Sequence, residues 1–193
     1  MKVAVRLMGF VWRPLTDSEE DTEYVLRMRN APIAQEAFFT PHITREEHLR
    51  FVRAPERDEE INWIIEKGGE RVGASGIYRV DRKNRRAEAG RVVVAESPLY
   101  LFNLYVSCYV VFEQLGLNKL VGDALASNSV VNWALQSVGG AREGLLREHV
   151  FKDGVPKDVY LYGTLASDWK RMKPSLIAQF GEPQIIRHYE DIM

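Results

Sequence analysis

One stretch of the sequence, residues 99–115, limits the possible folds more than any other. It is mostly apolar, it contains neither glycine nor proline, and Gly116 follows it. This pattern predicts a helix, because glycine is the usual residue just beyond a helix end. Apolar side chains occur on nearly all sides of the helix, so it has to be buried by the rest of the chain or covered by a partner.

The elements around this helix follow a recognisable order. The first helix is expected to be capped by Thr16 or Asp17, and the second by Thr44, with Glu47 at the capping-box spacing. The order β-α-α-β-β-β-α-β-α-β-β predicts an α/β (α+β) domain with a mixed, largely antiparallel central sheet flanked by helices. The predicted strands and hairpins are residues 3–13, 60–80, 86–96, 118–126 and 141–166, and the predicted helices are residues 16–30, 41–55, 99–115 and 128–138.

The length and composition favour one globular domain. The chain has 193 residues, of which 46% are hydrophobic and 27% charged, which suffices for a substantial core. We place the domain at residues 1–168 and a carboxyl-terminal tail at residues 169–193. The tail contains Pro174 and Pro183 and is expected to pack on the domain or on a second subunit.

Several classes of function are excluded by the same numbers. The net charge is −1, so no basic field favours a nucleic acid partner. Apolar runs are too short for a membrane helix, and the first strand lacks a signal-peptide cleavage pattern. Histidines and cysteine have no metal-ligand spacing, so no metal is expected. The single cysteine, Cys108, fits a reducing cytoplasm.

Three passages carry a resemblance to a known family: "VVFEQLGLNKLVGDALASN", "NSVVNWALQSVGGAREGLLREHVFKDG" and "DVYLYGTLASDW". With the opening "RPLTDSEEDTEYVLRMRN", they resemble the GNAT superfamily of acyl-CoA-dependent N-acetyltransferases over residues 5–170. Two subgroups are most similar. One comprises the ribosomal-protein N-terminal acetyltransferases, and the other the amino-sugar-nucleotide acetyltransferases of the pseudaminic acid pathway.

The resemblance implies acetyl-CoA as cofactor and a place for it. Two neighbouring parallel strands would splay apart, and their free backbone groups would bind the cofactor arm and polarise the thioester. The helix start after the first of these strands would hold the pyrophosphate. The implied cofactor-binding residues are Val93, Val94, Ala95, Tyr100, Leu101, Phe102, Asn103 and Asn128. Asn128 has a second interpretation as an ordinary helix cap.

The same loop departs from the family pattern. The two usual glycine positions fall at Pro98 and Tyr100, and a usual alanine falls at Asn103. Glycine lets the backbone lie against phosphate oxygens, because it has no Cβ. Leu135 stands where many relatives have a tyrosine that protonates the leaving thiolate. These departures place the binding of acetyl-CoA in question.

Candidate catalytic and substrate residues follow from the resemblance, each with a structural alternative. Glu88 matches an acidic position that takes the amine proton, or it is a solvated strand carboxylate. His149 is a base or a sugar contact, or an ordinary hairpin histidine. The proposed substrate-binding residues are Phe38, Phe39, His42, Tyr160 and Tyr162, for which packing within the domain or between subunits is the alternative.

Three functions remain open at this stage. The first is transfer of an acetyl group from acetyl-CoA to a primary amine of a small molecule, such as an amino sugar or sugar nucleotide. The second is the same reaction on a protein amino terminus. The third is a GNAT-like scaffold that has lost acetyl-CoA and serves another catalytic or binding role. The apolar helix and tail also lead us to expect a homodimer.

Overall fold

A computed structural model of the chain describes residues 1–39, 42–54 and 59–186. In these residues, nine strands form one sheet in the order β7-β8-β6-β5-β4-β3-β2-β1-β9. All neighbouring strands run antiparallel except β5 and β6, which are parallel. The strands are β1 (Ala4–Leu7), β2 (Phe10–Pro14), β3 (Ile61–Lys67), β4 (Glu70–Asp81), β5 (Arg86–Val94), β6 (Lys119–Leu125), β7 (Ala141–Lys152), β8 (Val155–Leu165) and β9 (Gln184–Ile186). The predicted largely antiparallel mixed sheet is confirmed.

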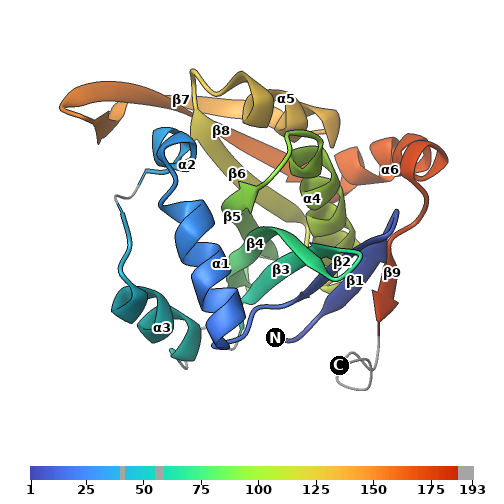
Figure 1. Cartoon of the computed structure of the whole chain (residues 1–193). Coiled ribbons are helices and arrows are strands. Elements are labelled where there is room, and N and C mark those ends of the chain that lie inside the picture. Colours follow the sequence, from blue (N-terminus) through green and yellow to red (C-terminus); the bar gives the residue numbers. More distant parts are fainter. Residues whose placement is uncertain (40–41, 55–58, 187–193) are drawn as a thin grey trace.

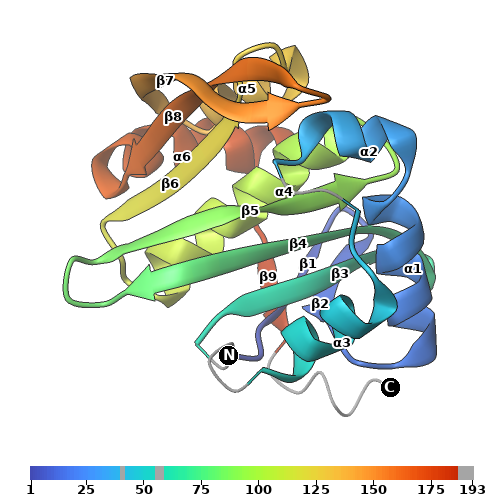
Figure 2. The same cartoon turned by 90° about the vertical axis from the view of Figure 1, so that its left-hand side faces the viewer.

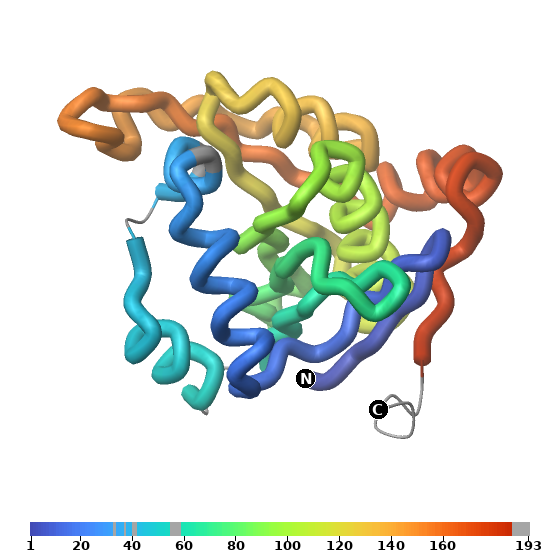
Figure 3. The backbone as a smooth tube through the Cα atoms, viewed as in Figure 1, coloured from blue at the N-terminus to red at the C-terminus, as the bar shows by residue number. Residues whose placement is uncertain are grey.

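Helices cover both faces of this sheet (Figures 1 and 2). On one face lie α1 (Glu19–Arg29), α2 (Pro32–Ala37) and α3 (Arg45–Arg53). On the other face lie α4 (Pro98–Tyr109), its continuation η2 (Val110–Gln114), α5 (Ser129–Ser137) and α6 (Ala166–Phe180). The first strand, β1, pairs with β9, the last strand of the described chain, so the two ends of the described chain lie side by side (Figure 3).

The apolar helix predicted at residues 99–115 forms the centre of the second face. It runs from Pro98 through a π-helical turn to Gln114, so it begins and ends one residue earlier than predicted. Val106, Cys108 and Val110 are fully buried in the main core. The sheet and α6 supply the cover, since Trp169 of α6 stacks on Phe112 at a centroid distance of 6.0 Å.

The opening strand differs from its prediction. Residues 3–13 form a hairpin of β1 and β2 rather than one strand. Met8 and Gly9 make the turn with φ of 51° and 79°, a left-handed conformation that glycine adopts readily. The alternating pattern could not distinguish one strand from two, because both arms alternate in the same way.

The helix caps were predicted in part. Thr44 and Glu47 form the predicted capping box, with Thr44 N donating to Glu47 at 2.7 Å and Glu47 N donating to Thr44 at 3.2 Å. Ser18, rather than Thr16 or Asp17, caps α1. Thr16 instead donates to the Asp21 carboxylate at 2.8 Å, which removes its hydroxyl from the capping position.

The carboxyl-terminal segment is more regular than its prolines suggested. Helix α6 continues through Pro174, where proline removes one backbone hydrogen bond. The buried side chains of Trp169 and Leu176 hold the helix on either side of that position. Phe180 meets Phe102 edge-on at 5.2 Å, so the segment packs on its own domain. The last part of the predicted tail, residues 187–193, lies outside the described residues.

The described part of the chain has neither a membrane-spanning helix nor a metal-binding group of side chains. None of its helices is long and apolar enough to span a lipid bilayer. In residues 1–39, 42–54 and 59–186, no group of histidine, cysteine and acidic side chains is arranged to hold a metal ion.

A buried ionic cluster fixes α1 on the sheet. The carboxylate of Asp21, fully buried, accepts hydrogen bonds from Arg13 at 2.6 and 2.7 Å and from Arg71 at 2.9 Å. Burial alone would raise the pKa of Asp21, but the hydrogen bonds from Arg13, Arg71 and Thr16 outweigh it and hold that pKa well below its usual range. Folding therefore favours the ionised carboxylate.

We expect Asp21→Asn to lower the free energy of unfolding at pH 7 by about 3 kcal/mol, because the Arg13 guanidinium loses its main counter-charge. The folded-state pKa lies below the unfolded value of about 3.9, so the ionised carboxylate stabilises the protein above that pH and progressively less below it. Urea denaturation should therefore show a smaller difference in the free energy of unfolding between wild type and Asp21→Asn at pH 3 than at pH 7.

The matched control is Glu46→Gln, which removes an exposed pair with Arg50. That variant should differ from wild type by less than about 0.5 kcal/mol. If Asp21→Asn were as stable as wild type at pH 7, the ionic cluster around Asp21 would not stabilise the fold as described.

Candidate active site

The parting of β5 and β6 creates a cleft through the sheet. The two strands pair only where Arg86–Glu88 meet Lys119–Val121. Beyond these residues β5 continues to Val94 and β6 to Leu125 without pairing. Backbone groups on the facing edges are therefore open to a ligand, as the sequence resemblance implied.

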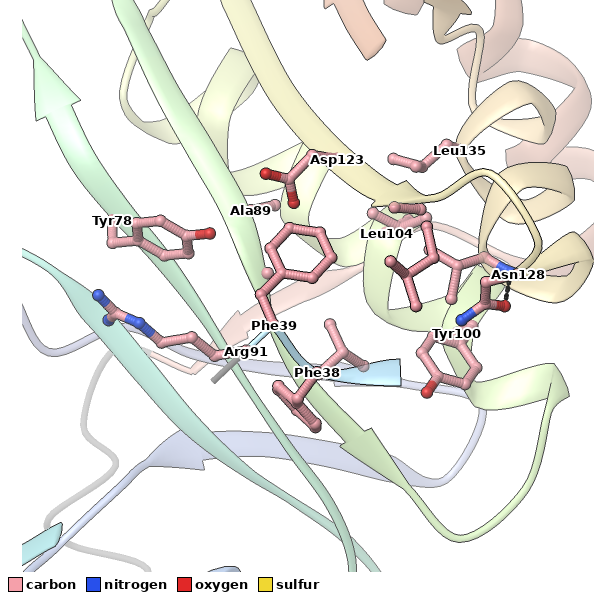
Figure 4. A pocket seen from close by; sticks show the side chains of 15 residues that line it. Phe38, Phe39, Tyr78, Ala89, Arg91, Tyr100, Leu104, Asp123, Asn128 and Leu135 are labelled. Atoms are coloured by element: carbon pink, nitrogen blue, oxygen red, sulfur yellow. Dashed lines mark hydrogen bonds between the residues drawn. The ribbon is translucent and has the colours of Figure 1, made fainter. Parts of the chain in front are cut away.

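The cleft has a volume of about 230 Å³ and mixed walls (Figure 4). Phe38 and Phe39 enter from the end of α2, while β4 and β6 contribute Tyr78 and Asp123. Its other lining residues are Ala89, Gly90, Arg91, Val92, Tyr100, Leu104, Ala124, Leu125, Asn128, Val131 and Leu135.

A β-bulge shapes the β5 side of the cleft. Gly76 of β4 lies opposite Gly90, but Ala74 lies opposite Val93, so β5 has one extra residue here. Arg91 in the bulge has φ of 56°. A bulge redirects the backbone locally, which turns peptide groups of residues 90–92 away from regular pairing. Gly90 is required beside it, because a Cβ there would lie 2.7 Å from the Tyr78 hydroxyl.

The bulge also changes which β5 residues face the cleft. We predicted Val93, Val94 and Ala95, but the lining residues are Ala89 to Val92. Val93 packs in a separate core cluster with Tyr24, and Ala95 N donates to Val72 O at 2.9 Å within the β4–β5 pairing. Val93, Val94 and Ala95 therefore lie outside the walls of the cleft, and the bulge separates them from the lining residues of β5.

Acidic groups gather where the two strands part. Asp123 is exposed at the cleft, yet surrounding protein raises its pKa, first through desolvation and then through the negative charge of Glu88. Burial raises the pKa of Tyr78 to about 12, and Asp123 and Glu88 add to that rise. Tyr78 is therefore protonated at neutral pH. Arg79 and His149 lower the pKa of Asp123 and so lie within electrostatic range.

The two predicted catalytic residues both belong to this group without lining the cleft. Glu88 accepts hydrogen bonds from Arg79 at 3.0 and 3.3 Å, which fits its interpretation as an ion-paired strand carboxylate. His149 is exposed on β7. Asp123 and Tyr78 were missed. The sequence signal for Asp123 was a charged residue inside the apolar strand "LVGDALA".

The start of α4 is only partly open to the cleft. Of the four predicted residues there, Tyr100 alone lines it. Phe102 packs on Phe10 and Phe180, and Asn103, 1% exposed, accepts a hydrogen bond from Trp12 Nε1 at 3.1 Å. We therefore correct the placement of Phe102 and Asn103, because helical geometry directs these side chains into the core.

Backbone donors are scarce at the same helix start. Pro98 has no N–H, Leu99 N donates to Glu96 O at 3.1 Å, and Tyr100 N donates to Ser97 O at 3.1 Å. A helix amino terminus binds phosphate through free N–H groups. Pro98, Leu99 and Tyr100 offer none, so the pyrophosphate seat that the resemblance implied would need donors from other residues.

The remaining predicted residues divide between the cleft and the core. Asn128 lines the cleft and also caps α5, since its Oδ1 accepts a hydrogen bond from Val131 N at 3.1 Å. His42 is exposed and lies outside the cleft walls. Tyr162 is buried in the core, while Tyr160 lies under Arg142, whose guanidinium carbon is 3.6 Å from the ring centroid. Neither tyrosine lines the cleft.

We expect the Asp123 carboxyl to titrate above the ordinary aspartate value of about 3.9, as its surroundings disfavour the charged form. Removing the Glu88 charge with Glu88→Gln should lower the midpoint, and His149→Ala should raise it. Carbon-13 NMR of the side-chain carboxyl measures all three midpoints. A wild-type midpoint at or below the ordinary value would refute this account of the cleft.

Comparisons with known proteins agree on the fold. No family model matches the chain. An uncharacterised N-acetyltransferase of Bacillus subtilis, YoaA, is 32% identical over 107 residues, which cover 53% of this chain and 60% of the relative. The matched part thus spans less than two thirds of that relative.

Solved structures match over most of the chain. RimJ of Mycobacterium smegmatis, crystallised with CoA-disulfide, has a TM-score of 0.77 at 21% identity and covers 95% of this chain and 96% of its own. A GCN5-related N-acetyltransferase of Brucella melitensis has a TM-score of 0.75 at 18% identity, and the match covers 92% of this chain and 85% of that protein. The chain therefore has the GNAT fold.

Proposed function

We propose that the protein is a GNAT-type N-acetyltransferase that acetylates a primary amine. The parted edges of β5 and β6 beside Asp123 and Tyr78 carry the proposal, because they combine open backbone groups with an acid–base pair in one cleft. The likeness to YoaA and to RimJ in complex with CoA-disulfide supports the same class of reaction. When bound, acetyl-CoA supplies the acetyl group as an activated thioester.

The residues of the cleft have distinct parts in this proposal. Asp123 accepts the proton that the amine loses, and its raised pKa makes it a stronger base than an ordinary aspartate. Backbone N–H groups of residues 90–92 would stabilise negative charge on the reacting carbonyl oxygen. Tyr78, protonated at neutral pH, holds a proton beside Gly90 that can be given to the departing sulfur.

The acceptor we propose is a small molecule, such as an amino sugar or sugar nucleotide. Phe38 and Phe39 offer aromatic faces that suit the apolar side of a sugar ring. The alternative acceptor, a protein amino terminus, needs a groove that admits an extended chain. Lys152 at the tip of β7 donates to the Gln35 carbonyl at 2.6 Å and to that of Phe38, which ties the hairpin to α2 beside the cleft. This tie favours a small acceptor.

A second candidate function is supported by the closed first turn of α4. A protein of this fold without acetyl-CoA would use the cleft to bind another molecule. Pro98, the occupied N–H groups of Leu99 and Tyr100, and the ring of Tyr100 at the cleft all favour this alternative. In the first proposal the arm of the cofactor would pair with the parted strands, and its pyrophosphate would need donors from elsewhere.

Calorimetry with acetyl-CoA distinguishes the two candidates. The proposed function predicts saturable binding by the wild-type protein, with a dissociation constant tighter than about 1 mM. A Pro98→Gly, Tyr100→Gly variant should bind more tightly, because it frees space for phosphate and restores a backbone donor. Wild-type protein that shows no heat at millimolar cofactor, while the variant does, would select the second candidate.

Asp123→Asn should reduce kcat by about 100-fold or more in an acetylation assay with amino sugars, since general base catalysis contributes about that much. Acetyl-CoA binding should stay unchanged, because the substitution preserves shape and leaves the β5 backbone intact. Asp17→Asn, which changes an exposed aspartate paired with Arg53, is the matched control. Full activity of Asp123→Asn would exclude this residue as the base.

A further inference from the structure

A second cavity lies beside the cleft, between the sheet and the helices α1 and α3. It has a volume of about 330 Å³, within the usual range for small-molecule sites. Strands β3, β4 and β5 form its floor, and the helices lie above, on the face seen in Figure 2. Most of its walls are apolar, from Leu15, Val25, Ile43, Trp63, Ala74 and Val93.

Two polar groups in these walls have no hydrogen-bond partner among the described residues. Nε2 of His48 and Oγ of Ser75 are each shielded from solvent and make no hydrogen bond to any described residue. His48 is 3% exposed and Ser75 is 4% exposed. Leaving such a group unpaired costs about 1–3 kcal/mol. Both line the cavity, so an occupant with hydrogen-bonding groups would satisfy them.

The charged groups around the cavity are already engaged. Arg91 donates to Glu60 at 2.5 Å and to Asn62 at 3.0 Å, and Arg29 stacks on Phe38 at 3.6 Å. The Glu47 carboxylate belongs to the capping box of α3. Burial lowers the pKa of His48, so its imidazole is neutral at pH 7. A charged ligand would therefore enter without a counter-ion, which is costly.

We propose that this cavity is a binding site for a neutral, largely apolar small molecule that carries a hydroxyl or amide group. That group pairs with Ser75 Oγ and His48 Nε2, while the apolar part rests on Trp63, Ala74 and Val93. Phe38 and Arg91 wall both this cavity and the cleft. The occupant therefore lies directly behind the candidate active site and is separate from the acetyl-CoA position.

Trp63 provides a direct reporter for this proposal. Its ring is fully buried, lines the cavity, and donates through Nε1 to Val3 O at 2.7 Å. The chain has four tryptophans. Trp133 is exposed on α5 and Trp169 is a buried residue of α6, so their indole signals serve as internal controls. The readout needs neither acetyl-CoA nor enzymatic activity.

The experiment is a titration of the full-length protein with benzamide, followed by nitrogen-15 NMR of the indole signals. Benzoate and benzylamine are charged probes of matched shape. Benzamide should shift the Trp63 signal with a dissociation constant of about 1 mM, as expected for a fragment of this size. The Trp133 and Trp169 signals should stay in place, and the charged probes should bind at least tenfold more weakly.

Two variants locate the occupant. Ser75→Ala should weaken benzamide about fivefold, by loss of one hydrogen bond. Ala74→Leu should fill the cavity and abolish the Trp63 shift, with its folding checked by thermal unfolding. If that variant does not fold, the affinity of Ser75→Ala for benzamide alone tests the proposal. An unmoved Trp63 signal, equal binding of the charged probes, or unchanged binding by Ser75→Ala would each overturn the proposal.

Discussion

The short parallel pairing of β5 and β6 is the constraint on which the candidate site depends. Three residues of each strand pair, and then the strands part. Each parted edge stays ordered because its other side is paired, β5 with β4 and β6 with β8. A sheet edge inside a protein normally leaves costly unpaired backbone groups. Here both edges open into a cleft, so a ligand can satisfy what the sheet leaves free.

Much of the architecture could be predicted from local patterns in the sequence. The apolar run at residues 99–115 predicted the central helix, and Thr44 with Glu47 predicted the start of α3, because both signals depend on residues close in the chain. The hairpin of β1 and β2 was missed, since alternation continues through its turn. Helix α6 was missed because burial of Trp169 and Leu176 outweighs the cost of Pro174.

The site was predicted less well, for a different physical reason. Its residues depend on register between strands, which no single segment determines. One extra residue at Arg91 interrupts the register of β4 and β5, and the cleft walls include Gly90 but not the predicted Val93. Asn103 is removed from the cleft by Trp12, which lies 91 positions away in sequence. Glu88 lies within electrostatic range of Asp123, but Asp123 comes from another strand and is brought close only by the fold.

The two ends of the proposed cofactor site make different demands on the sequence. The parted strands offer main-chain groups, which most side chains can provide as long as the bulge and Gly90 persist. A pyrophosphate seat instead requires the absence of Cβ atoms and the presence of free N–H groups in one helical turn. Pro98 removes one N–H group at the start of α4, and the side chain of Tyr100 lines the cleft. The parted strands can therefore persist while the helix start changes, because the two features depend on different properties of the sequence.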